Sequence, residues 1–422
     1  MSLIKGAVGS NDYSSSSRLI DGEGRLYWNP RRMETPLISF LGAYGRADKG
    51  MSYQNQPLFG EAVGGVKDGQ ASKSLAKREV KNAKFTMFTN QSAERSTRIN
   101  LAAGYNSTDV SIVVDDGTLF VANDLIRNVR TGEVMMVSAV STNTLTVTRA
   151  WGSTGAAMLD NDQIVFLSSA YPVNALSGTS KSTIPSESFN YTQIFRSPLQ
   201  IGRTDKLSAL NFTPGSDEER LLKEAGYTQL VNQEMAFWYS TKNEAAAVDS
   251  SGTRQRSTGG IFQHITTNVS DISATGGILT EPVLDGFAEQ AFDRGSTTKF
   301  LFCSPKVLSK INQLAKDKIR MTSAKENVYG LDLMEYMTAH GTFMLVRTSH
   351  FGSEGLSSVY GGHAVAIDPE QIKYAYLGES ENELRLNIQE NDRDGVKHEW
   401  IAEAGLQITN ETTHAILKGV VA

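Results

Sequence analysis

The strongest helical pattern of the chain is SDEERLLKEAGYTQLVNQEMAFWYSTKN, residues 216–243, and it constrains the fold more than any other feature. Ser216 and Glu219 form a capping-box pair, which marks the start of a helix. The acidic residues between them suit the positive end of the helix dipole. Such a helix spans about 40 Å at 1.5 Å per residue, and we expect its aromatic end, 237–239, in a core or an interface. Side chains at helical spacing predict its buried stripe: Leu222, Ala225, Gln229 or Leu230, and Phe237.

Residues 101–168 have a different pattern, in which apolar and polar side chains alternate between frequent turn signals. Alternation with a period of two is typical of half-buried strands. We predict a compact all-β unit of about six short strands. The segments on either side are polar and extended, so the unit is interpreted as an insertion.

The rest of the chain mixes helices and strands. Pro282 and Gly295 bracket a predicted helix, KFLFC (299–303) reads as a buried strand, and Pro305 opens a second helix with Leu308, Ile311 and Leu314 on one face. Strands follow in 341–377, and long antiparallel strands are expected toward the C-terminus. The predicted fold class is therefore α+β.

The N-terminal quarter is polar and basic. Residues 1–60 hold too few apolar residues for a core of their own and are expected to form an arm that gains order on another surface. Residues 1–100 carry 15 Lys and Arg against 9 Asp and Glu, although the whole chain has a net charge of −5. This quarter could face phosphate or an acidic neighbour, or form an ordinary solvated surface. Its basic residues at helix-like or mixed spacing are Lys73, Lys77, Arg78, Lys81 and Lys84.

The motifs of common enzyme classes do not occur in the sequence. It has no P-loop, no dinucleotide-binding fingerprint and no zinc-binding spacing among its six histidines. Cys303, the one cysteine, lies in an apolar run and is predicted to be a buried structural thiol. DND (160–162) and NDRDG (391–395) are interpreted as turns rather than as metal sites. We therefore expect no catalytic, cofactor-binding or metal-binding residues, and no cofactor.

The sequence also gives no signal for export or membrane insertion. The first residues lack an apolar signal core, and nowhere do 18 apolar residues follow one another. We expect a protein made in a cytoplasm, without a membrane partner.

The segment NYTQIFRSPLQI, residues 190–201, reads as a strand that breaks at Pro198. Tyr191, Ile194 and Phe195 surround Arg196, and these residue choices are unusually particular for a connection. We expect the three apolar side chains to anchor a junction and Arg196 to reach a carboxylate, on this chain or another.

Several segments, taken in order, resemble the major capsid proteins of tailed bacteriophages, in particular the SU10-type group with the Hong Kong 97-type fold. NYTQIFR is the most specific match, because the family carries nearly the same string on the return of its extended loop. TPLISFLGAYG (35–45), STGGIFQHITTN (257–268) and KFLFCSPKVLSKI (299–311) are similar to family segments, as are HGTFMLVRTSHF (340–351), HAVAIDPEQIKYAYL (363–377) and EWIAEAGLQITNETTHAIL (399–417).

The resemblance implies an arrangement of domains along the chain. It implies an N-terminal arm at 1–60, an extended loop at 61–210 interrupted by the β insertion at 101–168, a peripheral domain at 211–274 whose spine helix is 216–243, an axial domain at 275–378, and peripheral strands at 379–422. Only about 60 residues precede the loop, so an internal scaffolding segment is not expected. Nothing identifies the partners of a covalent cross-link, and ion pairs are favoured for the loop lysines.

The function that the resemblance implies is structural. Copies would associate into hexamers and pentamers of an icosahedral shell around double-stranded DNA, assembled in a bacterial cytoplasm. Its partners would be itself, neighbouring capsomers and DNA, with decoration, scaffold and portal proteins as further candidates. An encapsulin-like nanocompartment shell protein is the alternative, and an unfamiliar enzyme and a decoration or tail protein are further rivals. The candidate inter-subunit contacts are Lys73, Lys77, Arg78, Lys81, Lys84, Tyr191, Phe195 and Arg196.

Overall fold

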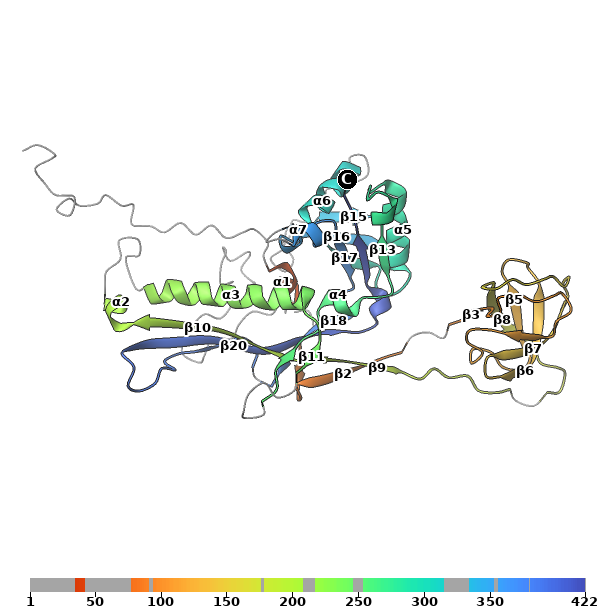
Figure 1. Ribbon diagram of the computed structural model, residues 1–422, viewed down its shortest axis with the longest axis horizontal. Helices are drawn as coiled ribbons and strands as arrows, with labels where there is room; N and C mark the ends of the chain where they lie inside the picture. Colours follow the sequence, from red (N-terminus) through yellow and green to blue (C-terminus); the bar gives the residue numbers. More distant parts are fainter. Residues whose placement is uncertain are drawn as a thin grey trace, which may run out of the picture. The chain divides into compact units, whose positions relative to one another are not determined.

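The computed structural model describes most of the chain in two compact units, one of Met1–Met87 with Ser188–Ala422 and the other of Phe88–Glu187 (Figure 1). The two units are described separately below. The described residues are 35–41, 77–90, 94–175, 178–207, 217–245, 253–314, 334–352, 356–378 and 380–421.

The first sheet of the larger unit has the order β1-β18-β20-β10, with β19 also pairing with β20. β1 runs parallel to β18, and the other pairs are antiparallel. In β10 buried and exposed residues alternate at the centre, as a half-buried strand requires. The strands are β1 (Lys77–Val80), β10 (Gln193–Gly202), β18 (Ile372–Leu377), β19 (Glu383–Arg385) and β20 (Gly395–Ile408).

Pro198 does not break this sheet, contrary to the prediction from its sequence. It lies within β10, paired in register with Glu399. Because β10 is the last strand of the sheet, one side of its backbone has no neighbouring strand in the sheet, and a residue without an N–H is tolerated there.

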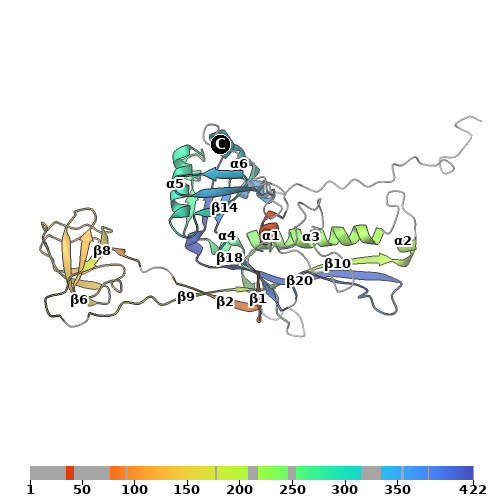
Figure 2. The same ribbon diagram turned by 180° about the vertical axis from the view of Figure 1, so that it is seen from behind.

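The long helix α3 (Asp217–Tyr239) lies along β10 and β20 (Figures 1 and 2). Gln229, Leu230 and Phe237 are buried as predicted, whereas Leu222 and Ala225 are half-buried. Its buried face also includes polar residues, which bond to the sheet: Ser197 of β10 donates to Gln229 at 2.7 Å, and Gln233 donates to Asn382 at 2.5 Å.

The second sheet has the order β13-β21-β17-β14-β16-β15. KFLFC forms most of β14, which is buried as predicted, and the helix after it buries Val307 and Ile311 while Leu314 stays exposed. The strands are β13 (Val269–Asp271), β14 (Thr298–Cys303), β15 (Met334–Met337), β16 (Thr342–Arg347), β17 (Ala364–Ile367) and β21 (Ala415–Lys418). The helices beside it are α5 (Glu281–Phe292) and α6 (Pro305–Leu314).

The two sheets do not divide the chain at residue 378. β18, expected in the axial segment, pairs in the first sheet, and β21, expected among the peripheral strands, pairs in the second. The ring of Tyr374 in β18 packs against Phe237 of α3 at a centroid distance of 5.8 Å.

Short elements complete the larger unit. They are α1 (Pro36–Leu41), α2 (Arg203–Leu207), α4 (Ile261–His264), α7 (Ser357–Tyr360), β11 (Asn243–Glu244), β12 (Arg256–Ser257), η2 (Ser273–Thr275), η4 (His350–Gly352) and η5 (Glu411–Thr413).

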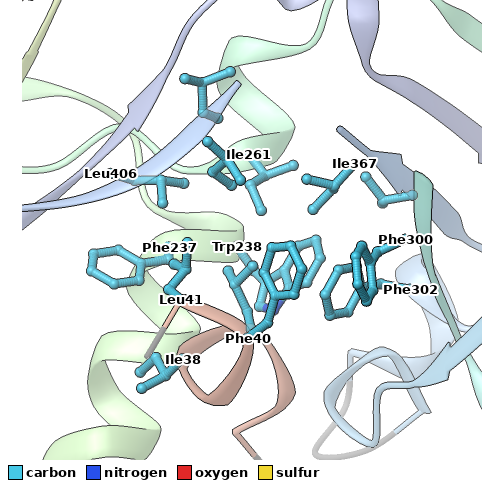
Figure 3. Close-up of a cluster of buried hydrophobic side chains, with 14 of the residues drawn as sticks. Ile38, Phe40, Leu41, Phe237, Trp238, Ile261, Phe300, Phe302, Ile367 and Leu406 are labelled. Carbon is cyan, nitrogen blue, oxygen red and sulfur yellow. The ribbon is translucent and has the colours of Figure 1, made fainter. Parts of the chain in front are cut away.

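One hydrophobic cluster joins α1, α3 and both sheets (Figure 3). Phe40 of α1 packs against Phe300 and Phe302 of β14, at centroid distances of 4.5 and 5.7 Å. Trp238 of α3 also contacts Phe302, at a centroid distance of 5.4 Å. Leu406 of β20 belongs to the same cluster, so the two sheets of this unit share one core.

The smaller unit is a six-stranded all-β structure with the order β3-β8-β5-β6-β7-β4. Its first and last strands are joined by an isolated bridge between Ile99 and Val114, which closes the sheet on itself around a core that includes Ile126 and Val137. The strands are β3 (Ser96–Arg98), β4 (Ser111–Val113), β5 (Asp124–Asn128), β6 (Val134–Ser141), β7 (Thr144–Thr148) and β8 (Gln163–Ser169).

A two-stranded ribbon of β2 (Lys84–Thr89) and β9 (Ser186–Tyr191) completes the described chain. The helix-like spacing of basic residues in 61–100 is therefore misleading, because β1 and β2 are strands. The apolar residues Phe85 and Met87 alternate with exposed ones in β2, which is a strand period.

Candidate assembly site

The arm helix α1 is held on the body of its own chain by one buried carboxylate. The backbone N–H groups of Leu37 and Ile38 donate to Glu234 Oε1 and Oε2, at 3.0 and 2.8 Å. The indole Nε1 of Trp238 also donates to Glu234 Oε1, at 2.8 Å. Glu234 therefore caps the first turn of α1, because the first N–H groups of a helix have no carbonyl partner within the helix. Within the predicted arm, residues 1–60, the structure describes 35–41, and this part lies on α3 of the same chain.

The environment of Glu234 sets two effects against each other. Complete burial disfavours the charged carboxylate, and the three donated hydrogen bonds favour it. Burial is the larger effect and raises the pKa of Glu234 to about 7. The side chains that accompany this cap are buried completely: Leu37, Ile38, Phe40 and Leu41.

The segment NYTQIFR forms a second junction, centred on Asn190 at the end of the ribbon. The side chain of Asn190 is completely buried. Its amide nitrogen donates to the backbone oxygens of Leu406 and Gly259, at 2.7 and 3.0 Å. Its oxygen accepts the N–H of Gly259 at 2.7 Å. Asn190 thus links β9, β20 and the segment that follows β12.

Neighbouring residues of the motif repeat this role. The hydroxyl of Thr192 donates to Glu403 at 2.9 Å, and the side-chain oxygen of Gln193 accepts the N–H of Thr258 at 3.2 Å. Glycine is needed for the close approach of the backbones. A Cβ on Gly405 would lie 2.6 Å from the backbone carbonyl oxygen of Tyr191, and one on Gly260 would lie 2.8 Å from that of Trp238.

The residues expected to anchor this junction are only partly the right ones. Phe195 is buried and packs edge-on against Phe237 at 6.3 Å. Tyr191 is half-buried against Phe189, with centroids 5.6 Å apart. Ile194 is 57% exposed, because the strand alternation turns it away from α3, so its predicted anchoring role is wrong. Arg196 lies 3.8 Å from Glu399 on the paired strand of the same chain, and its side chain is largely exposed.

The basic residues predicted as inter-subunit contacts lie in different surroundings. Lys77 forms an ion pair with Glu381, and Arg78 donates to Gln407 at 2.9 Å. Lys81 is exposed. Lys84 lies over the ring of Phe189, 4.2 Å from its centroid. Lys73 lies outside the described residues.

Sequence reasoning missed Glu234, Asn190, Thr192 and Gln193. Polar residues on a predicted buried face were a usable signal for Glu234, since it falls on the stripe that contains Leu230 and Phe237. The asparagine at the start of NYTQIFR offered no such signal, because its partners are backbone atoms about 70 and 216 residues away.

The described residues hold little reactive chemistry. They include no group of three or more His, Cys, Asp or Glu side chains placed to hold a metal ion. Cys303 is buried as predicted, and burial raises the pKa of its thiol. Asp162 of the DND turn is bonded to Arg130 and Asn128, which accounts for its carboxylate without a metal. Among the described helices, none is both long and apolar enough to cross a membrane.

Glu234 and Asn190 thus hold extended segments onto the folded α+β body of the same chain. The family model for the SU10 major capsid protein matches residues 28–421, so the chain belongs to that family. Its function is that of a phage major capsid protein. The match also favours this function over a nanocompartment shell.

The chain is also similar to a curated phage protein and to several solved structures. The chain is 22% identical over 301 residues to the major capsid protein of Pseudomonas phage PaMx41, which covers 67% of this chain and 68% of that protein. A structure from Mycobacterium phage Bobi has a TM-score of 0.41 at 8% identity, covering 84% of this chain and 95% of its own. The encapsulin of Synechococcus elongatus has a TM-score of 0.38 at 10% identity, covering 57% and 78%. Because both TM-scores lie below 0.5, the family assignment rests on the sequence match.

Proposed function

We propose that copies of this chain associate into hexamers and pentamers, which close into an icosahedral shell around double-stranded DNA. The observation that carries the proposal is the match of the SU10 major capsid protein family over residues 28–421. The shell is the virion capsid, and it is assembled in the cytoplasm of the bacterial host.

The fold that fits this function is the Hong Kong 97-type fold. In this proposal the first sheet and α3 form the peripheral domain, with α3 as the spine helix, and the second sheet with α5 and α6 forms the axial domain. The ribbon of β2 and β9 is the base of the extended loop, and the all-β unit Phe88–Glu187 is its insertion. The family match over residues 28–421 supports this assignment.

The partners that follow are other copies of the chain, neighbouring capsomers and the packaged DNA. Decoration, scaffold and portal proteins join them in particles that carry these components. The net charge of +6 over residues 1–100 supports sequence-independent contact with phosphate or with acidic neighbours.

Particles purified from infected host cells test the proposal. We expect this chain to be the most abundant protein of particles that protect double-stranded DNA from added nuclease. Particles built from this chain that contain an enzyme as cargo and no genome would contradict it and support the nanocompartment alternative.

A further inference from the structure

Two lysines lie against one aromatic ring at the base of the ribbon. Lys84 of β2 and Lys242, just after α3, place their ammonium nitrogens 4.2 and 4.4 Å from the centroid of the Phe189 ring. Each contact is favourable because the face of an aromatic ring is electronegative. We call these three residues the lysine platform.

The lysine platform carries two positive charges that the described part of the chain does not neutralise. Both nitrogens lie within 4.4 Å of one centroid, so the two charges are near each other and repel. Among the described residues neither ammonium forms an ion pair with a carboxylate, whereas nearby Lys77 does. The charge of Lys242 also contributes to lowering the pKa of His264, second to the burial of that ring. The platform is therefore a surface suited to an anionic group.

The complementary charge is found on an exposed turn of the same unit. The NDRDG turn and the residue before it expose three carboxylates, from Glu390, Asp392 and Asp394, beside the single cation of Arg393. None of these carboxylates has an ion-pair partner among the residues that the structure describes. The turn is thus the negative counterpart of the lysine platform.

One copy of the chain cannot join these two surfaces. The turn precedes Gly395 at the start of β20, whereas Gly405 near its end lies against Phe85 and Tyr191 at the base of the ribbon. Ten residues of strand separate these points by about 33 Å at roughly 3.3 Å per residue. An ion pair between the surfaces therefore requires a second copy.

We propose that the lysine platform of one copy binds the acidic 390–394 turn of a neighbouring copy. This inference rests on the proposed self-assembly. The contact joins different surfaces of the two partners, so it is heterologous, and repeated contacts of this kind form a ring when the rotation between copies closes. Its strength falls as salt is added, because both surfaces are exposed to solvent.

A charge swap in the full chain tests the contact. Lys84→Glu with Lys242→Glu should lower the yield of assembled particles at least ten-fold at low salt. The matched control is Arg127→Glu with Lys306→Glu, which changes the net charge equally at two exposed basic residues and should assemble normally. Adding Asp392→Lys and Asp394→Lys to the first variant should restore at least half of the yield. A yield equal to that of the control, or a swap that restores nothing, would overturn the inference.

The substitution of the turn alone gives a second test, which holds even if the platform variant misfolds. Asp392→Lys with Asp394→Lys changes only exposed residues and should also lower assembly at least ten-fold, while circular dichroism stays unchanged. Normal assembly of this variant would overturn the inference whatever the platform variant does. If the unmodified chain itself fails to assemble, it is the proposed function that fails.

Discussion

Replacing Glu234 with alanine should release the arm helix α1 from the body of the protein. Glu234→Ala removes the acceptor of three hydrogen bonds, from the backbone of Leu37 and Ile38 and from the indole of Trp238. The docking of α1 is a near balance of two large contributions to its free energy, so the hydrogen bonds are decisive.

The two contributions can be compared from the structure. Burying the four large side chains of α1 stabilises docking by about 6–12 kcal/mol, at roughly 1.5–3 kcal/mol each. Ordering its six residues costs about 6–12 kcal/mol of backbone entropy, at roughly 1–2 kcal/mol each. Because these nearly cancel, the Glu234 hydrogen bonds, at about 1–3 kcal/mol each, determine whether α1 stays docked.

Hydrogen exchange of the amides of Leu37 and Ile38 measures this directly. In Glu234→Ala, their protection should fall by about 100-fold or more, which corresponds to roughly 3 kcal/mol. Glu234→Gln keeps one good acceptor and should lose about ten-fold. Protection within two-fold of the unmodified protein in Glu234→Ala would refute the assignment of Glu234 as the cap of α1.

The same docking should depend on pH. The pKa of Glu234 is about 7 in the folded protein, above its usual value of 4.5, so the folded state binds the proton more tightly than the unfolded state does. The contribution of Glu234 to the stability of the docked state is most favourable below pH 4.5 and is lost as the pH rises through 7. Protection factors, corrected for intrinsic exchange, should fall over this range in the unmodified protein and stay level in Glu234→Gln.

Three further outcomes are expected. Asn190→Ala leaves several buried backbone groups unpaired and should lower the free energy of unfolding, measured in denaturant, by about 3 kcal/mol. The control Asn82→Ala changes an exposed residue and should alter it by less than about 0.5 kcal/mol. Equal effects of the two substitutions would contradict the role of Asn190 in the junction. Phe195→Ala should lower the free energy of unfolding by about 3–5 kcal/mol, and Ile194→Ala, at an exposed residue, by far less. If thermal melts ranked the two substitutions in the opposite order, Phe195 would not be a core residue. Burial lowers the pKa of three histidines from 6.5 to about 4, so the folded state resists their protonation. The stability of the protein should therefore fall as the pH drops from 6.5 toward 4. A melting temperature that stays constant over this range would contradict the prediction. These histidines are His264, His363 and His414.

The sequence was informative wherever structure follows a short period. The apolar run KFLFC predicted a buried strand, and Pro282 and Gly295 predicted a helix between them, and the structure confirms both elements. These patterns work because burial of one face is decided within a few residues.

Features set by distant partners could not be predicted in this way. The exposed side of Ile194 depends on which face of β10 meets α3, and the pairing of β18 and β21 depends on strands far away in the sequence. The roles of Asn190 and Glu234 depend on backbone groups brought from other segments. Propensity and spacing contain no information about such partners, although a buried carboxylate on an apolar stripe could have been flagged.

The central claim is that this chain builds a closed shell from its own copies, and electron cryomicroscopy of the purified, expressed chain tests it most directly. We expect closed shells with five-fold and six-fold capsomers, in which every subunit holds α1 against α3 through Glu234 of its own chain. Only small soluble particles across a range of salt, pH and protein concentration would contradict the claim.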